Sequence, residues 1–389
     1  MPSYRSCLPA VRVSAAALAI GAAALAVPPA SAAARGWRTV PGPALAAGAS
    51  ANLTGLAMAG PSRGWASGFT MASQDSSFQP LLAAWNGRRW RTVALRLGRL
   101  SSARLDGLAA ASPRDAWAVG SVSRAASSQR PLMLHWNGHR WARVPGAGVP
   151  GFGYMSLLGV AVRSATDAWA VGEAESVTKP VVRPVIEHWN GRRWRLMANP
   201  PVPPMTALSS VTVAPDGEAW AVGTPFADTG RGVVLHWTKR SWVTAATPVT
   251  GGAVFMNGVT AVSRANVWAV GSASIAGGPY RPYALRWNGH RWTSVAVPHP
   301  GEGNASWEFE SITSTGHGHL VAVGSDTPAG AKPGRALYGA WNGRDWSLRT
   351  GPHITQLNAV SFDGRHAIWA VGSQTTSSQS FRPIVQVNG

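Results

Sequence analysis

The sequence has a single cysteine and few acidic residues. Its 389 residues include one cysteine, Cys7, which excludes a disulfide scaffold and leaves no thiolate metal site or cysteine nucleophile further along the chain. Charged residues make up only 13%, with 16 acidic residues against 35 Lys and Arg, so the formal charge is +19. The 44 Gly and 29 Pro exclude long uninterrupted helices, and the 20 Trp exclude a disordered chain.

Long apolar runs are also missing, except near the N-terminus. Arg5 and Arg12 precede an apolar stretch at residues 13–27. Residues 30–32 (Ala-Ser-Ala) form a small-x-small cleavage site. This pattern predicts a secretory signal peptide over residues 1–32. The alternative, a membrane anchor, would need a longer apolar stretch. We therefore expect a secreted, extracellular product of residues 33–389 with no transmembrane segment after cleavage.

Two short motifs recur along the rest of the chain at intervals of about 50 residues. The first, Trp-Ala-Val-Gly or a variant of it, begins at Trp65, Trp117, Trp169, Trp220, Trp268, Val321 and Trp369. The second, typified by Trp-Asn-Gly-Arg-Arg-Trp, begins at Trp85, Trp136, Trp189, Trp237, Trp287 and Trp341. Nineteen of the 20 Trp occupy repeated positions, and Trp307 does not. We therefore expect the repeated tryptophans to pack between units.

Each unit predicts four short strands, which we call A to D. In the second unit they are expected at residues 105–111, 116–122, 131–136 and 140–144. The Asn-Gly between strands C and D predicts a hairpin turn in which both residues have positive φ, with a cross-strand pair of tryptophans beside it. Units of about 50 residues with four strands are typical of β-propellers.

The two ends of the repeat predict a closed ring. The last unit reaches residues 387–389 where its strand D should begin, and residues 36–40 resemble strand D of the first unit. We expect residues 36–40 to complete the last blade, which leaves no open sheet edge. The expectation is an all-β, seven-bladed propeller of four-stranded antiparallel blades over residues 33–389, present as a monomer.

These motifs resemble the secreted WAVG/HWNG-repeat propeller proteins of actinobacteria, loosely described as kelch-like or galactose-oxidase-like. The resemblance covers residues 36–389 and implies the fold, with little about activity. The Gly-Gly doublet of true kelch repeats is missing, and so is the cysteine of the galactose oxidase cofactor. The Trp-Asn-Gly turn is only partly similar to the sialidase Asp-box, because Trp85 and Trp136 stand at its aspartate position.

Arginines recur six residues before the strand C tryptophan, at Arg130, Arg183, Arg231, Arg281 and Arg335. They are expected at the end of the propeller formed by the B–C and D–A connections, which we call the loop face. Such a set of guanidinium groups suits carboxylate or phosphate ligands. The alternative is that each arginine pairs with a neighbouring acid or a loop carbonyl.

Polar residues open most of the A strands, near the same face: Thr54, Asp106, Ser209, Asn257, Glu310 and Asn358, with Leu158 as the exception. They predict a polar ring around the channel, for a sugar, a cation or water, or else side chains that satisfy loop amides or pair with the arginines. Residues 302–310 are the most site-like stretch, because Trp307 could stack on a sugar and is followed by Glu308 and Glu310. The alternative for Trp307 is packing.

The opposite end, made of the A–B and C–D turns, is called the turn face, and its C–D turns are rich in Arg. This basic rim suggests attraction to anionic surfaces, or else a solvated surface. His135, His188 and His236 share one repeated position and are expected to pack, while His317 and His319 alone make a poor metal site.

The functional hypothesis is a non-catalytic binding or scaffold propeller whose ligand is a glycan, a cell-envelope polymer or a protein, bound on the loop face. The ligand-binding candidates are Arg130, Arg183, Arg231, Arg281, Arg335, Asn257, Trp307, Glu310 and Asn358. The alternative is a polysaccharide-acting enzyme, a glycosidase or lyase, with Asp106, Glu308 and Glu310 as acid/base candidates. No metal or cofactor is expected, and nucleic acid is not the expected partner of an exported protein.

Overall fold

The computed structural model describes residues 36–71, 77–98, 100–125, 128–226, 230–274, 278–299, 305–327, 334–353, 355–377 and 380–389. The expected signal peptide lies outside these residues. Every regular element in the described part is a β-strand. Among those residues there is accordingly no helix with the length and apolar character needed to cross a membrane.

The strands form units of four, each expected from one sequence repeat. The first three units are β2 (Ser50–Met58), β3 (Gly64–Met71), β4 (Phe78–Trp85), β5 (Trp90–Thr92); β6 (Ser102–Ser112), β7 (Asp115–Ala125), β8 (Ser128–Trp136), β9 (Trp141–Arg143); and β10 (Tyr154–Ser164), β11 (Asp167–Glu175), β12 (Val182–Trp189), β13 (Trp194–Leu196). The next two are β14 (Thr206–Val213), β15 (Ala219–Pro225), β16 (Val233–Trp237), β17 (Trp242–Thr244); and β18 (Val254–Ser263), β19 (Asn266–Ala273), β20 (Arg281–Trp287), β21 (Trp292–Val295). The last are β22 (Ser306–Gly316), β23 (His319–Thr327), β24 (Arg335–Trp341), β25 (Trp346–His353); and β26 (Thr355–Phe362), β27 (Ile368–Ser377), β28 (Ser380–Asn388), with β1 (Arg38–Val40).

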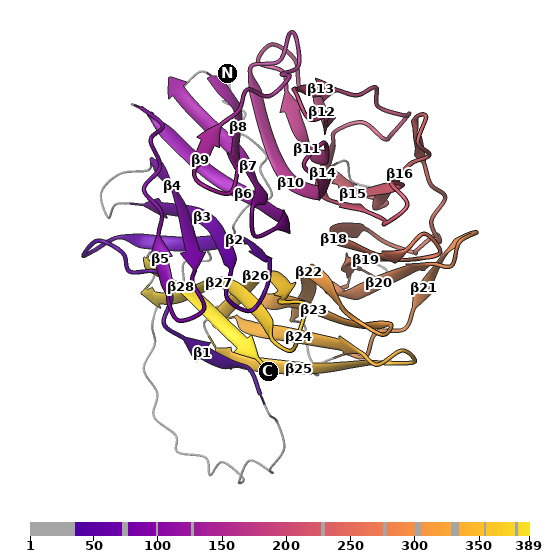
Figure 1. Cartoon of the computed structure of the whole chain (residues 1–389). Coiled ribbons are helices and arrows are strands. Elements are labelled where there is room, and N and C mark those ends of the chain that lie inside the picture. The colour runs from indigo at the N-terminus through magenta and orange to yellow at the C-terminus, as the bar shows by residue number, and fades with distance from the viewer. Residues whose placement is uncertain are drawn as a thin grey trace.

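These units are antiparallel sheets that resemble propeller blades. Five are separate four-stranded sheets, while the units β6–β9 and β10–β13 join into one eight-stranded sheet through a single parallel pairing of Tyr154 with Gln129. Figure 1 shows the sheets side by side around a central axis, with the first strand of each unit nearest the middle. The four expected strands of the second unit all form, and strand A is longer than expected at its start.

The two ends of the chain meet in one sheet. Strand β1 pairs antiparallel with β28, with Thr39 opposite Gln386, so that this sheet has the order β1-β28-β27-β26. The sheet β2–β5 packs against it, because Asn358 on β26 donates to the carbonyl oxygen of Leu53 on β2 at 2.7 Å. A single apolar cluster contains Leu53 and Trp90 from one sheet and Trp369 from the other.

Tryptophans from neighbouring sheets form the core between them, as expected. Trp117, which is fully buried on β7, lies with its ring centroid 4.9 Å from those of Trp189 and Trp194 in the next unit. The same trio recurs with Trp65, Trp169, Trp220, Trp268 and Trp369 as the central ring. Because large aromatic side chains dominate the burial energy of a core, these trios are the main apolar link between the sheets.

The turn between strands C and D differs from the expectation. Trp85 pairs with Trp90 as predicted, but Gly87 has a φ of 89° while Asn86 is not among the residues with positive φ. Instead, Oδ1 of Asn86 accepts hydrogen bonds from the backbone N–H groups of Arg88 and Arg89, at 3.1 and 3.0 Å. The asparagine therefore holds the turn through its side chain, and only the glycine needs the left-handed conformation.

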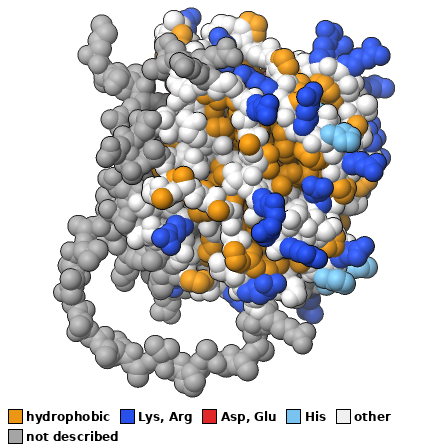
Figure 2. All heavy atoms as spheres, turned by 60° about the vertical axis from the view of Figure 1, so that its left-hand side comes forward, with side chains coloured by type: hydrophobic (Ala, Val, Ile, Leu, Met, Phe, Trp, Pro, Cys, Tyr) orange, Lys and Arg blue, Asp and Glu red, His pale blue; other side chains and the backbone are white. Residues whose placement is uncertain are grey.

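The surface of this fold is basic. Figure 2 shows Lys, Arg and His side chains spread over one side of the molecule, with no Asp or Glu side chain visible among the described residues in that view. Apolar side chains lie between the basic ones.

Candidate functional site

The polar ring expected around the channel coincides with a structural irregularity in every A strand. Each A strand pairs with its B strand with a register shift, and the extra residue is the one predicted for the ring, for example Thr54 between Leu53 and Gly55. The other extra residues are Asp106, Leu158, Ser209, Asn257, Glu310 and Asn358. A β-bulge leaves its extra residue outside the ladder and redirects its side chain.

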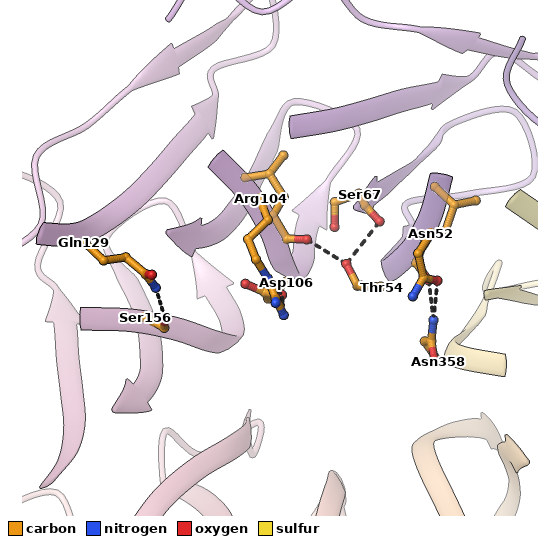
Figure 3. Close-up of polar contacts among 10 residues, drawn as sticks. Asn52, Thr54, Ser67, Arg104, Asp106, Gln129, Ser156 and Asn358 are labelled. Atoms are coloured by element: carbon orange, nitrogen blue, oxygen red, sulfur yellow. Dashed lines mark hydrogen bonds and ion pairs between the residues drawn. The ribbon is translucent and has the colours of Figure 1, made fainter. Parts of the chain in front are cut away.

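Three of these side chains connect neighbouring A strands. Thr54 Oγ1 donates to the carbonyl oxygen of Leu105 at 2.6 Å, and Asn257 Nδ2 donates to that of Phe309 at 2.9 Å. Asn358 makes the equivalent bond to Leu53 and also donates to Asn52 Oδ1 at 2.8 Å (Figure 3). These residues therefore satisfy backbone groups, as one alternative proposed, although the acceptors are carbonyls of the next inner strand and not loop amides.

Asp106 is held by an arginine from its own strand. Arg104 Nε donates to Asp106 Oδ1 at 2.7 Å (Figure 3). The Arg104 guanidinium lies 5.5 Å from the centre of the Phe69 ring. Burial opposes the charge on Arg104, but the ion pair with Asp106 outweighs it and raises the pKa of Arg104. Sequence reasoning missed Arg104, although it lies two residues before Asp106 on the same strand.

A buried acid from the next unit faces the same ion pair. Glu173 on β11 is 7% exposed, and its Oε2 has no hydrogen-bond partner in the described structure. Burial, together with the charge of Glu175, raises the pKa of Glu173 to about 7, despite the opposing charge of Arg104. Sequence reasoning missed Glu173 as well; the signal was a charged residue directly after the Trp-Ala-Val-Gly motif, where the other units carry Ser, Thr or Phe.

Glu308 and Glu310, both predicted as site residues, lie on β22 and contact one another. Burial, followed by the charge of Glu308 and a hydrogen bond between the two carboxyl groups, raises the pKa of Glu310 well above its usual value. A hydrogen bond between two carboxyl groups forms only when one of them is protonated, so it favours the protonated form of Glu310. The structure does not place Asp106 in this pair, since Asp106 is bound to Arg104.

Trp307 is not a surface residue, which corrects the expectation that its ring could stack on a sugar. It is 1% exposed and belongs to the apolar cluster between the fifth and sixth units, together with Phe309 and Trp346. The Arg335 guanidinium stacks over the Trp307 ring, 5.0 Å from the ring centroid, and its Nε pairs with Asp326 Oδ2 at 3.2 Å. Arg335 is thus structural. Residues 302–304 of the site-like stretch lie outside the described residues.

The other four predicted arginines have no acidic partner among the described residues. Arg130 and Arg183, from neighbouring units, meet at the same residue: Arg130 Nη1 donates to the Phe152 backbone carbonyl at 3.5 Å, and the Arg183 guanidinium lies 5.5 Å from the centre of the Phe152 ring. Both are exposed. Arg231 is also exposed, and Arg281 has a buried Nη1 without a hydrogen-bond partner in the described structure.

Arg130 also lines a surface cavity. This open groove of about 510 Å³ is bordered by Val122, Ser128, Arg130, Arg143 and Pro145. A second cavity, beside Arg231 and Tyr283, has about 10 Å³, which is room for a single water molecule. The groove beside Arg130 is therefore large enough for a ligand of several atoms.

The histidines before the strand C tryptophan pack as expected, with an addition. The His236 ring is stacked on the Trp220 ring with 3.8 Å between their centroids, and His236 Nε2 lies 3.0 Å from Glu218 Oε2. Burial lowers the pKa of His236 in spite of that carboxylate. His135 and His188 make the same contacts with Asp115 and Asp167. The described residues contain no group of three or more His, Cys, Asp or Glu that could hold a metal ion.

Comparison with known structures identifies the class of fold. Ycf48, solved bound to the D1 peptide, aligns with a TM-score of 0.56 and 14% identity over 92% of this chain and 98% of its own. A protein of unknown function from Dyadobacter fermentans aligns with a TM-score of 0.52 and 6% identity over 87% and 94%. A Hadza microbial sialidase aligns with a TM-score of 0.48 and 12% identity over 82% of this chain and 75% of its own. The chain is an all-β protein of the β-propeller type.

At these identities the likeness concerns the fold alone. No protein-family model matches the chain, and the search of curated proteins gives no match either.

Proposed function

We propose that this chain is an exported, non-catalytic binding propeller that recognises an anionic glycan or cell-envelope polymer on its loop face. The observation that carries the proposal is the pair Arg130 and Arg183, which meet at Phe152 without an acidic partner among the described residues. Arg143 lines the groove beside Arg130, so three guanidinium groups border this region. Guanidinium groups bind carboxylates and phosphates in a bidentate manner, which suits an acidic polymer.

The arrangement of carboxyl groups supports binding over catalysis. A glycosidase needs two carboxyl groups about 5 to 9.5 Å apart on either side of the scissile bond. Glu308 and Glu310 are in direct hydrogen-bond contact, which is closer than that, and Asp106 is engaged by Arg104. A protein ligand is the other alternative, since Ycf48 is solved with a bound peptide.

The test is a screen of residues 33–389 against acidic and neutral glycans, with two matched double variants. Arg130→Gln with Arg183→Gln should weaken binding of a carboxylate- or phosphate-bearing glycan at least tenfold, because both charges are lost from one site. Arg88→Gln with Arg192→Gln, on the turn face, should leave that binding unchanged. Affinity should also fall as the salt concentration rises.

Three outcomes would overturn this proposal. Binding that does not depend on salt, or that is equal for neutral glycans, would remove the role of the arginines. Turnover of any polysaccharide, abolished by Glu310→Gln, would establish the enzyme alternative. Export is tested separately, since the secreted protein should begin at Ala33, and a product retaining residues 1–32 would contradict it.

We propose further that the seven units form one closed ring latched by β1. The pairing of β1 with β28 and the apolar cluster shared by the first and last units support this arrangement. Deleting residues 36–40 should therefore expose the edge of β28 and lower the melting temperature of the whole protein in one cooperative transition. A deletion variant that melts as late and as sharply as the parent would contradict a closed ring.

A further inference from the structure

The face opposite the proposed glycan site carries a ring of basic residues. In a sheet of four antiparallel strands the A–B and C–D turns lie at the same end, which is the turn face. The exposed Lys and Arg in or beside these turns are Arg63, Arg88, Arg89, Arg114, Arg140, Arg163, Arg192, Arg193, Lys239, Arg240, Arg264, Arg291, Arg344 and Arg365. Every one of the seven units contributes at least one of them, so the charge is spread around the axis and does not follow one stripe.

The C–D turns hold these charges in a repeated geometry. Asn190 Oδ1 accepts the backbone N–H groups of Arg192 and Arg193, both at 3.1 Å, just as Asn86 does for Arg88 and Arg89. Asn137, Asn288 and Asn342 make the same pair of bonds in their units. The backbone of these turns is thus ordered before any partner arrives, so docking costs little backbone conformational entropy.

Acidic residues do little to neutralise this face. Its exposed acids among the described residues are Asp216 and Asp345. Asp216 lies 3.5 Å from Lys239, and Asp345 lies 3.7 Å from Arg344. Asp115, Asp167 and Glu218 face histidines in the core, although Asp167 also binds Arg163 and Glu218 binds Arg264. Arg88, Arg89, Arg192, Arg193, Arg240 and Arg291 have no ion pair within the described structure.

A ring of charges at one end of a disc suits a flat partner. A linear polyanion would contact a few neighbouring turns, whereas a planar surface can contact all seven units at once. Among the residues that the structure describes, the exposed large hydrophobic side chains are Val177, Leu196, Val243 and Val249, and none of these lies in the turns. The contact would therefore be electrostatic, at the level of headgroups, without insertion of apolar residues.

We propose that the turn face docks on an anionic lipid bilayer surface, through the phosphate groups of its headgroups, which leaves the loop face pointing away from the membrane. Each Arg close to an anionic membrane strengthens binding by about fivefold. A protein with many such residues spread over one face would therefore associate reversibly with the bilayer and be released by salt.

The experiment is co-sedimentation of residues 33–389 with vesicles of phosphatidylcholine alone or mixed in equal parts with phosphatidylglycerol. Binding is expected only with phosphatidylglycerol, and it should fall steeply with salt. A variant carrying Arg88→Gln, Arg89→Gln, Arg192→Gln and Arg193→Gln should lose roughly 600-fold in partitioning, about fivefold for each arginine. The control on the loop face, Arg130→Gln with Arg183→Gln, removes two charges there and should partition like the parent, whereas Arg88→Gln with Arg192→Gln removes the same number from the turn face and should weaken partitioning.

Each other outcome decides against the inference. Equal binding to neutral vesicles would show that charge is not the cause, and no binding to either vesicle would remove the lipid partner. If soluble polyphosphate binds more tightly than vesicles and displaces the protein from them, the partner is a linear polyanion. The melting temperature of the fourfold variant should equal that of the parent, and Arg88→Lys with Arg192→Lys should retain binding, so that unfolding cannot imitate the loss. Failure here leaves the glycan proposal intact, since that rests on the other face.

Discussion

Replacing Glu173 with glutamine should change how the stability of the protein depends on pH. Folding raises the pKa of this carboxyl group from 4.5 to about 7, chiefly by burial. The folded state therefore holds a proton that the unfolded chain has released, over the whole range between these two values. Stability contributed by this proton is complete below about pH 4.5 and is lost as the pH rises through about 7.

The magnitude follows from the two values. At about 1.4 kcal/mol for each tenfold change in acidity, the loss amounts to about 3 kcal/mol in the free energy of unfolding. Because Glu173 is only 7% exposed, solvent screening reduces this little. Glu173→Gln keeps the shape but has no proton to release, so it should be about as stable as the parent near pH 4.5 and up to about 3 kcal/mol more stable near pH 8.

The assay is urea unfolding followed by tryptophan fluorescence at a series of pH values from about 5 to 8. The difference between parent and variant isolates Glu173, since Glu310 and Glu187, whose pKa values burial also raises, contribute equally to both proteins. Glu175→Gln is the control: it removes a neighbouring charge that raises the pKa of Glu173, so the loss of stability should remain but be smaller. Identical pH dependence in the parent and Glu173→Gln would refute the reasoning.

Two further predictions concern the repeated motifs. Trp117→Ala should lower the free energy of unfolding by about 3 to 5 kcal/mol, because it empties a fully buried site between two units; Val249→Ala, at an exposed site, should change the melting temperature little, and equal effects would contradict the packing role. Gly87→Ala should cost about 1 to 2 kcal/mol, since Gly87 has a φ of 89° and an added Cβ would lie 3.1 Å from Ser62 Cβ. Gly251→Ala, which has open space and no positive φ, should be neutral in the same thermal melts.

Much of the fold could be predicted because it is repetitive. Trp-Ala-Val-Gly lies within the second strand of each unit, Trp-Asn-Gly begins at the end of the third, and their recurrence at one period placed all four strands of each unit. The packing role of the tryptophans followed from the same recurrence, and the trios around Trp117 and its equivalents confirm it. The turn was predicted less well, because Asn86 acts through its side chain, a contact that the dipeptide alone does not reveal.

The candidate site could be predicted only in outline. The repeated polar position of the A strands was recognised, but it was wrongly expected to open each strand. It lies within the strand as the extra residue of a bulge, and a bulge depends on how two strands pair. Arg104 and Glu173 were missed because they come from different units. Only the packing of one sheet on the next brings these two side chains together. Trp307 was misjudged because its position breaks the repeat, although the extra ring still fills the core.

For this protein, period and composition alone determined the strand order within each unit, the aromatic core and the basic surface, because each of these follows from a local pattern that the repeats share. The tertiary structure decided which charges are free. Arg335 forms an ion pair with Asp326, whereas Arg130 and Arg183 form no ion pair with a described residue, although all three occupy one repeated position. Whether a charge finds a partner depends on side chains brought near it from other strands and loops, and the sequence period does not specify those distances.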